Sequence, residues 1–158
     1  LGVAGDSAGG NLAAVSALLA RNEGIRLAAQ ALIYPVTAPD AEAQSHHDNA
    51  DGYLLTRKHV LWFQSHYRRC ETDREDFRYA PLIAPSHADL APALIQVAQY
   101  DPLRDEGIAY AQKLMDAGNN VTLTHYAGMV HAFFALSGAV DAGRAAMAEV
   151  CSFFNKHL

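Results

Sequence analysis

Short apolar stretches alternate with longer segments of helical periodicity along this chain. Four apolar stretches predict buried strands, at residues 1–4, 29–34, 93–100 and 121–126. Four segments with an apolar face or a capping signal predict helices, at residues 11–21, 56–69, 104–117 and 140–156. This alternation is typical of a mostly parallel sheet with flanking helices, so the predicted fold class is α/β.

Local signals define the ends of several of these elements. A proline follows the second and the third predicted strand and cannot extend either one. Thr56 is placed to cap the second helix, and Gly118 is placed to end the third. The first helix is expected to present an apolar face made of Leu12, Val15, Leu18 and Leu19. The segment between the second and third strands is otherwise rich in loops.

Composition narrows the function classes. With 158 residues, 51% of them hydrophobic, the chain has enough apolar material for a globular core. A formal net charge of -5, without a cluster of Lys and Arg, argues against a nucleic-acid partner. No apolar run approaches the roughly 18 residues that span a bilayer, so we expect a cytoplasmic protein without a membrane span. Cys70 and Cys151 have neither metal nor disulfide spacing and are expected to be buried thiols.

A nucleophile elbow is indicated where the first strand meets the first helix. The residues Gly5-Asp6-Ser7-Ala8-Gly9 match G-x-S-x-G, in which a serine occupies a sharp strand-to-helix turn. Glycines on either side allow the strand and the helix to approach closely. Ser7 is therefore the predicted nucleophile, and the Ala8 N–H is the predicted oxyanion-hole donor. A flexible Gly/Ser loop is the alternative, whereas the glycine spacing of nucleotide-binding loops is absent.

An activated serine needs a base and an orienting carboxylate, which this fold supplies in the order Ser, Asp or Glu, His. Asp101 lies at the end of the third strand and is the predicted acid. Asp105 and Glu106 are its rivals, but acidic residues in a first helical turn have a sufficient structural role. His131 is the predicted base because it lies in the loop expected after the fourth strand. His125, within that strand, is expected to be packed and hydrogen-bonded.

The remaining histidines have no predicted chemical role. The sequence His46-His47-Asp48 suggests a metal site, but it has no strong third ligand, and solvated surface is the favoured interpretation. No role is predicted for His59, His66, His87 and His157. We therefore expect neither a metal nor a cofactor.

Three motifs, in order, resemble those of the bacterial hormone-sensitive-lipase family of esterases (family IV). They are GDSAGG at residues 5–10, YDPLRDEG at residues 100–107 and GMVHAF at residues 128–133. The similarity covers nearly the whole chain. The resemblance implies an α/β-hydrolase fold, with Ser7 as nucleophile, Asp101 as acid and His131 as base.

The sequence departs from the family in two places. Ala132 stands where the family usually has glycine after the histidine, and little effect is expected from it. The His-Gly-Gly-Gly loop that supplies most of the family's oxyanion hole has no counterpart here. Since Leu1 is not an initiator methionine, we expect residues 1–158 to be the C-terminal portion of a single catalytic domain, without its N-terminal strands, cap and oxyanion loop. Such a chain alone is expected to be nearly inert.

The resemblance implies a serine carboxylesterase that hydrolyses short-to-medium acyl esters through an acyl-enzyme. The expected partner is therefore a small-molecule ester. An amide hydrolase with the same triad is one alternative, and a non-catalytic small-molecule receptor of the same fold is another. A homodimer through residues 121–126 is also expected, because an edge strand leaves a row of backbone groups unpaired.

Overall fold

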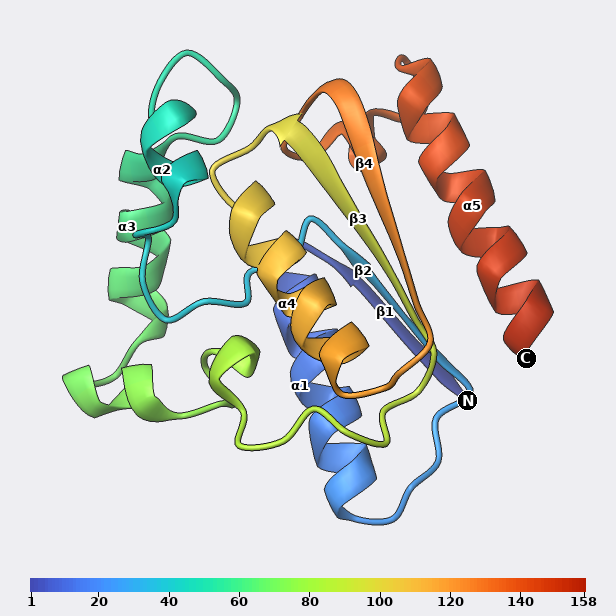
Figure 1. Ribbon diagram of the computed structural model, residues 1–158. Coiled ribbons are helices and arrows are strands. Elements are labelled where there is room, and N and C mark those ends of the chain that lie inside the picture. Colours follow the sequence, from blue (N-terminus) through green and yellow to red (C-terminus); the bar gives the residue numbers. More distant parts are fainter.

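The computed structural model describes residues 1–158. Its sheet has four parallel strands, and their order in space is their order in the chain. The strands are β1 (Gly2–Asp6), β2 (Ala29–Ile33), β3 (Ala93–Tyr100) and β4 (Val121–Val130). The predicted α/β class with a parallel sheet is confirmed (Figure 1).

Helices cover both faces of this sheet (Figure 1). The helices α1 (Ala8–Asn22) and α4 (Arg104–Asp116) lie on one face, and α5 (Asp141–His157) lies on the other. The long connection from β2 to β3 carries α2 (Gln44–Asp48) and α3 (Arg57–Tyr67). Three short 3-10 helices complete the chain, at η1 (Glu71–Glu75), η2 (Pro81–Ile83) and η3 (Phe133–Leu136). None of the helices combines the length and the apolar character needed to cross a membrane.

Most of the core lies between the sheet and the layer formed by α1 and α4. Leu18 of α1 and Leu114 of α4 are fully buried there against Leu32 and Ile95 of the strands. Each such leucine stabilises the fold by about 1.5–3 kcal/mol through burial. A smaller cluster on the α5 side contains Ile33, Tyr34, Ala98, Phe133 and Ala146.

The predicted leucine face of α1 is only partly correct. Val15 and Leu18 are buried, but Leu12 and Leu19 are 56% and 40% exposed. The positions that face the sheet are filled instead by Ala13, Ala14 and Ala17. Small side chains at these positions let the helix axis lie close to the strands, which leaves the two outer leucines at the margin of the contact.

The strand β4 continues to Val130, so the predicted end of this strand at Tyr126 is wrong. Ala98 pairs with Tyr126 and Tyr100 pairs with Val130. Thus β4 holds two more residues than β3 between these pairs, which is a β-bulge. Gly128 has φ of 74° inside the bulge, a conformation that favours glycine. Because the bulge lets pairing resume, His131 comes directly from the end of a paired strand.

Three predicted burials are wrong. Both cysteines are exposed, Cys70 just before η1 and Cys151 on α5. In α5, Ala146 and Val150 face the sheet, so the neighbouring Cys151 points away from it. His125 is exposed as well, because β4 is an edge strand that is only partly covered by helices.

Candidate active site

Ser7 occupies the turn between β1 and α1 in a strained conformation. Its φ is 53° and its ψ is -116°, which a residue with a side chain rarely adopts. The Ser7 N–H donates to the Ile33 carbonyl at 2.8 Å, and the Ser7 carbonyl accepts from the Val36 N–H at 3.3 Å. The N–H and the carbonyl of Ser7 are therefore held by the last residue of β2 and by the segment that follows this strand.

The two glycines of the motif differ in how much space they have. A Cβ atom on Gly5 would lie 2.1 Å from the carbonyl oxygen of Gly9. A Cβ atom on Gly9 would meet nothing nearer than a carboxylate oxygen of Asp6 at 3.8 Å. The close approach of strand and helix thus requires glycine at position 5, whereas position 9 has room for a methyl group.

Asp101 lies just after β3 and is completely buried. One carboxylate oxygen, Oδ1, accepts the Leu103 N–H at 2.9 Å. The other, Oδ2, lies 2.7 Å from Nδ1 of His131. The carboxylate is thereby oriented on one side by its own backbone turn and on the other by the imidazole.

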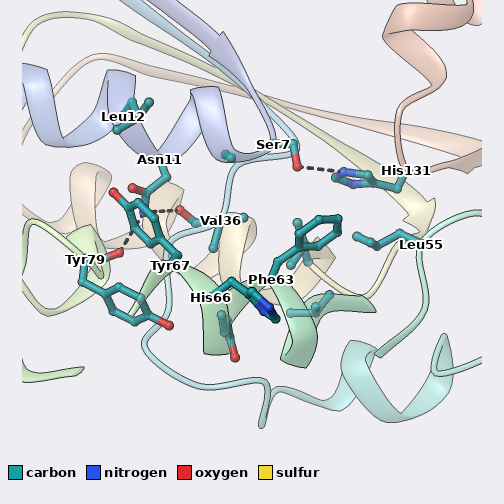
Figure 2. Close-up of a pocket in the computed structure, with 14 residues that line it drawn as sticks. Ser7, Asn11, Leu12, Val36, Leu55, Phe63, His66, Tyr67, Tyr79 and His131 are labelled. Atoms are coloured by element: carbon teal, nitrogen blue, oxygen red, sulfur yellow. Dashed lines mark hydrogen bonds between the residues drawn. The ribbon is translucent and has the colours of Figure 1, made fainter. Parts of the chain in front are cut away.

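His131 connects Asp101 to Ser7. Its Nδ1 faces the Asp101 carboxylate, and its Nε2 lies 2.9 Å from the Ser7 Oγ (Figure 2). Because a carboxylate accepts hydrogen bonds, Nδ1 carries the proton, and Nε2 is then free to accept from the hydroxyl. The side chain is 7% exposed. The structure therefore brings together the three residues that the sequence singled out, in a continuous hydrogen-bonded row.

Tyr34 is a neighbour of this row that the sequence analysis missed. Its ring centroid lies 4.6 Å from that of His131, and its hydroxyl lies 3.4 Å from a carboxylate oxygen of Asp6. Its φ of 36° is unusual for a bulky residue. Burial raises the pKa of Tyr34 well above its ordinary value, and the negative charge of Asp6 adds to this shift. The only sequence signal for its unusual backbone conformation is its position just before Pro35, at the end of a predicted strand.

The rival carboxylates form their hydrogen bonds with residues other than His131. Asp105 accepts the Ser45 N–H at 2.8 Å and the Arg104 Nε–H at 2.7 Å. Burial raises the pKa of Asp105, but the hydrogen bonds from Arg104 and Ser45 outweigh it and hold this pKa below its ordinary value. Glu106 is buried and accepts the Thr37 N–H at 2.7 Å. Their interpretation as structural residues agrees with these contacts.

The interpretation of residues 46–48 as solvated surface is wrong for His46. This side chain is 0% exposed, and its Nε2 lies 2.8 Å from the Glu106 Oε2. His47 and Asp48 are exposed as expected. His46 is buried because α2 packs against α4, a long-range contact with no local sequence signal. No group of three or more His, Cys, Asp or Glu side chains is arranged to hold a metal ion.

A pocket of about 640 Å³ opens beside Ser7 and His131. Figure 2 shows Ser7 and His131 on one side of it and Phe63 and His66 on the other. The remaining lining residues are mostly apolar and come from α1, α3 and the loops: Ala8, Asn11, Leu12, Val36, Leu55, Val60, Gln64, Tyr67, Tyr79 and Leu103. This volume lies within the usual range of about 300–1,000 Å³ for small-molecule sites. Most of these residues were not predicted as pocket residues, because the position of α3 and the loops beside Ser7 depends on contacts between distant segments.

Asn11 connects the walls of this pocket. Its side-chain amide donates to the carbonyls of Val36 and Tyr79, both at 2.9 Å (Figure 2). These two bonds join α1 to the loops after β2 and before η2. An apolar group bound in the pocket would therefore contact walls held by buried hydrogen bonds.

The elbow, the row of three side chains and the parallel sheet define a class of protein. The α/β-hydrolase fold family matches residues 1–135, well over half of the chain, and the chain belongs to that family. Its relatives include carboxylic ester hydrolases, which confirms the resemblance to bacterial hormone-sensitive-lipase esterases.

Carboxylic ester hydrolase LipN of Mycobacterium tuberculosis is 41% identical over 99% of this chain and 43% of its own length. Ethyl acetate hydrolase of Pseudomonas putida is 36% identical over 100% of this chain and 50% of its own length. The structure of EstE1, a thermostable carboxylesterase from a metagenomic library, superposes with a TM-score of 0.96 at 39% identity, over 99% of this chain and 54% of that one. This chain thus spans about half the length of the relatives it matches.

Proposed function

We propose that the protein is a serine carboxylesterase in which Ser7 is the nucleophile, His131 the general base and Asp101 the orienting acid. One observation carries the proposal. The Ser7 Oγ, both ring nitrogens of His131 and the Asp101 carboxylate form a row with contacts of 2.9 and 2.7 Å beside an apolar pocket. This arrangement has the geometry that acyl transfer requires of a nucleophile and its base.

In the first step, His131 Nε2 takes the proton of the Ser7 hydroxyl while Oγ attacks the ester carbonyl carbon. The resulting imidazolium is stabilised by the Asp101 carboxylate, which stays ionised. His131 then gives its proton to the leaving alkoxide, which departs as an alcohol and leaves an acyl-serine. In the second step, His131 removes a proton from water, the hydroxide attacks the acyl carbonyl, and Ser7 regains its proton as the carboxylic acid departs.

The oxyanion of each tetrahedral intermediate needs hydrogen-bond donors. Ala8 is the first residue of α1, so its N–H has no carbonyl one turn earlier in the helix to bind. We assign this N–H to the oxyanion, with the positive end of the α1 dipole behind it. Loss of one such donor typically lowers the rate by about 10²- to 10³-fold.

The proposed substrates carry short-to-medium acyl chains, a size that a pocket of about 640 Å³ can hold. Its walls are dominated by apolar side chains such as Val36, Val60 and Leu103, with few polar groups to bind a charged substrate. The names of the relatives, which include an ethyl acetate hydrolase and carboxylesterases, support the ester class over the amide class.

The test compares the protein with its Ser7→Ala variant, expressed with any residues that the gene encodes before Leu1. Hydrolysis of p-nitrophenyl butyrate by the parent protein, with loss of turnover in the variant, is expected. The matching anilide measures amide hydrolysis, and a fluorophosphonate probe reports a reactive Ser7. Undiminished turnover in Ser7→Ala would refute the proposal, and a parent protein that binds esters without reacting with the probe would favour a receptor.

A further inference from the structure

A short helix far from Asp101 in sequence is buried against the turn that follows it. This helix, α2, contacts the start of α4. Ser45, His46 and Asn49, which lie on α2 or just after it, are almost completely buried, while the neighbouring His47 is exposed. We name Ser45, His46 and Asn49 the α2 clamp.

Two members of the clamp bind the backbone of the Asp101 turn directly. The Ser45 Oγ donates to the Pro102 carbonyl at 2.6 Å and accepts the Asp105 N–H at 3.2 Å. The Asn49 Nδ2 donates to the Asp101 carbonyl at 3.3 Å. Three hydrogen bonds from the α2 clamp thus hold the backbone that carries the Asp101 carboxylate and the first residues after it.

His46 anchors the clamp to α4. The Glu106 Oε1 accepts the N–H groups of Thr37 and Ala38, at 2.7 and 3.2 Å, so Glu106 acts as an acceptor. The His46 Nε2, 2.8 Å from the other oxygen, is therefore the donor of that bond. His46 Nδ1 is buried without a partner, so the ring is not held in place by any other hydrogen bond.

The position of Asp101 is sensitive to this support. Its carboxylate must stay within hydrogen-bond distance of His131, and a displacement of about 1 Å typically lowers an enzymatic rate by about 100-fold. None of the three clamp residues lines the pocket. A loosened clamp should therefore slow the chemical step and leave substrate binding unchanged.

We propose that Ser45, His46 and Asn49 are positioning residues that set the distance between Asp101 and His131. This inference rests on the proposed function, since it assigns the clamp to the reaction of that same site. The clamp touches neither substrate nor the reacting atoms, and it acts only through the backbone of the Asp101 turn and through Glu106.

The test uses two matched pairs in the protein that hydrolyses p-nitrophenyl butyrate. His46→Ala is compared with His47→Ala, and Ser45→Ala is compared with Ser152→Ala, which alters an exposed serine on α5. We expect kcat to fall about tenfold or more in the two clamp variants, with KM changed less than about twofold. His46→Gln keeps a donor for Glu106 and should recover most of the rate.

A second measurement is independent of turnover. In protein labelled with ¹⁵N-histidine, the Nδ1 proton of His131 should give a downfield resonance that shifts in the clamp variants and not in the controls. Folded variants with the kcat and the resonance of their controls would overturn the inference. Failure of both His46→Ala and Ser45→Ala to fold would also overturn it, because the clamp would then be purely structural. If the unsubstituted protein shows no turnover, the proposed function fails, and the resonance still decides on the clamp.

Discussion

The two glycines that flank Ser7 are predicted to respond in opposite ways to alanine. In Gly5→Ala, the new methyl group would lie 2.1 Å from the carbonyl oxygen of Gly9 and 2.3 Å from its carbonyl carbon. These are backbone atoms, so no side-chain rotation can relieve the clash. In Gly9→Ala, the nearest atom is an Asp6 carboxylate oxygen at 3.8 Å, which is an ordinary contact.

The difference can be expressed as stability. Ordinary contact begins at 3.4 Å, so the strand and helix around Gly5 must separate by roughly 1 Å to admit the methyl group. Overpacking of this kind costs typically about 1–3 kcal/mol, and a clash between backbone segments belongs at the upper end of that range or above it. A destabilisation of about 3 kcal/mol lowers the Tm of a domain of this size by about 6–12 °C. Gly9→Ala should raise the Tm by about 1–4 °C. Alanine has less conformational entropy than glycine in the unfolded chain, which stabilises the folded state by about 0.4–1 kcal/mol.

Thermal unfolding followed by circular dichroism measures both variants against the parent protein. The rate of fluorophosphonate labelling, measured below both transitions, tests the elbow itself. Gly5→Ala should label more slowly because the displaced turn moves Ser7 away from His131. Equal Tm values for Gly5→Ala and Gly9→Ala would refute the reasoning, which rests on the different space around the added methyl group at the two positions.

Three further predictions concern residues around the site and in the core. Ala132→Gly should raise the free energy of unfolding by up to about 1 kcal/mol. Ala132 has φ of 66°, and this left-handed conformation costs alanine about 1–2 kcal/mol. The greater conformational entropy of glycine in the unfolded chain offsets part of that gain. Tyr34→Leu should slow fluorophosphonate labelling by about 10- to 30-fold through loss of the ring beside the His131 imidazolium, whereas Tyr34→Phe, which keeps the ring, should stay within about twofold of the parent. Burial holds the pKa of His87 below its ordinary value. As the pH falls through about 6.5, His87 therefore takes up a proton in the unfolded chain before it does so in the folded protein. Protonation thus favours the unfolded state, and the folded protein loses stability as the pH falls. His87→Gln, which keeps a donor for the Pro81 carbonyl, should therefore show a flatter dependence of Tm on pH between roughly pH 7 and pH 5.

Each of these predictions has a contrary result. A lower free energy of unfolding for Ala132→Gly than for the parent protein, measured by chemical denaturation, would contradict the prediction for Ala132. Equal labelling rates for Tyr34→Leu and Tyr34→Phe would show that the ring does not support His131. A pH profile of Tm for His87→Gln that runs parallel to the parent profile would assign the pH dependence to other groups.

Local patterns predicted the parts of the fold that depend on neighbouring residues. The strand at residues 93–100 and the cap at Thr56 are where the sequence indicated them, because an apolar run and a capping hydroxyl act over a few residues. The elbow could be recognised for the same reason, since its strain and close approach impose glycine at a set distance from Ser7. Asp101 and His131 could be predicted as site residues because each comes directly after a strand, at the edge of the sheet where ligands bind in this class of fold.

Other features depend on contacts between distant segments and had no local signal. His46 is buried by Glu106, which lies 60 positions away. Alanines rather than leucines fill the inner face of α1, because the spacing between helix and sheet decides which size fits. The bulge in β4 depends on its register with β3, and the exposure of Cys151 depends on the side of α5 that the sheet covers. Periodicity and composition describe none of these relations.

The hydrogen bond between Ser7 and His131 joins residues 124 positions apart. The ribosome therefore adds the histidine 124 residues after the serine, once β4 has been made. Until that strand pairs with β3, the Ser7 hydroxyl of the nascent chain has no imidazole beside it to accept its proton. Under the proposed mechanism, the serine would become reactive only after β4 has paired with β3 and brought the two residues together.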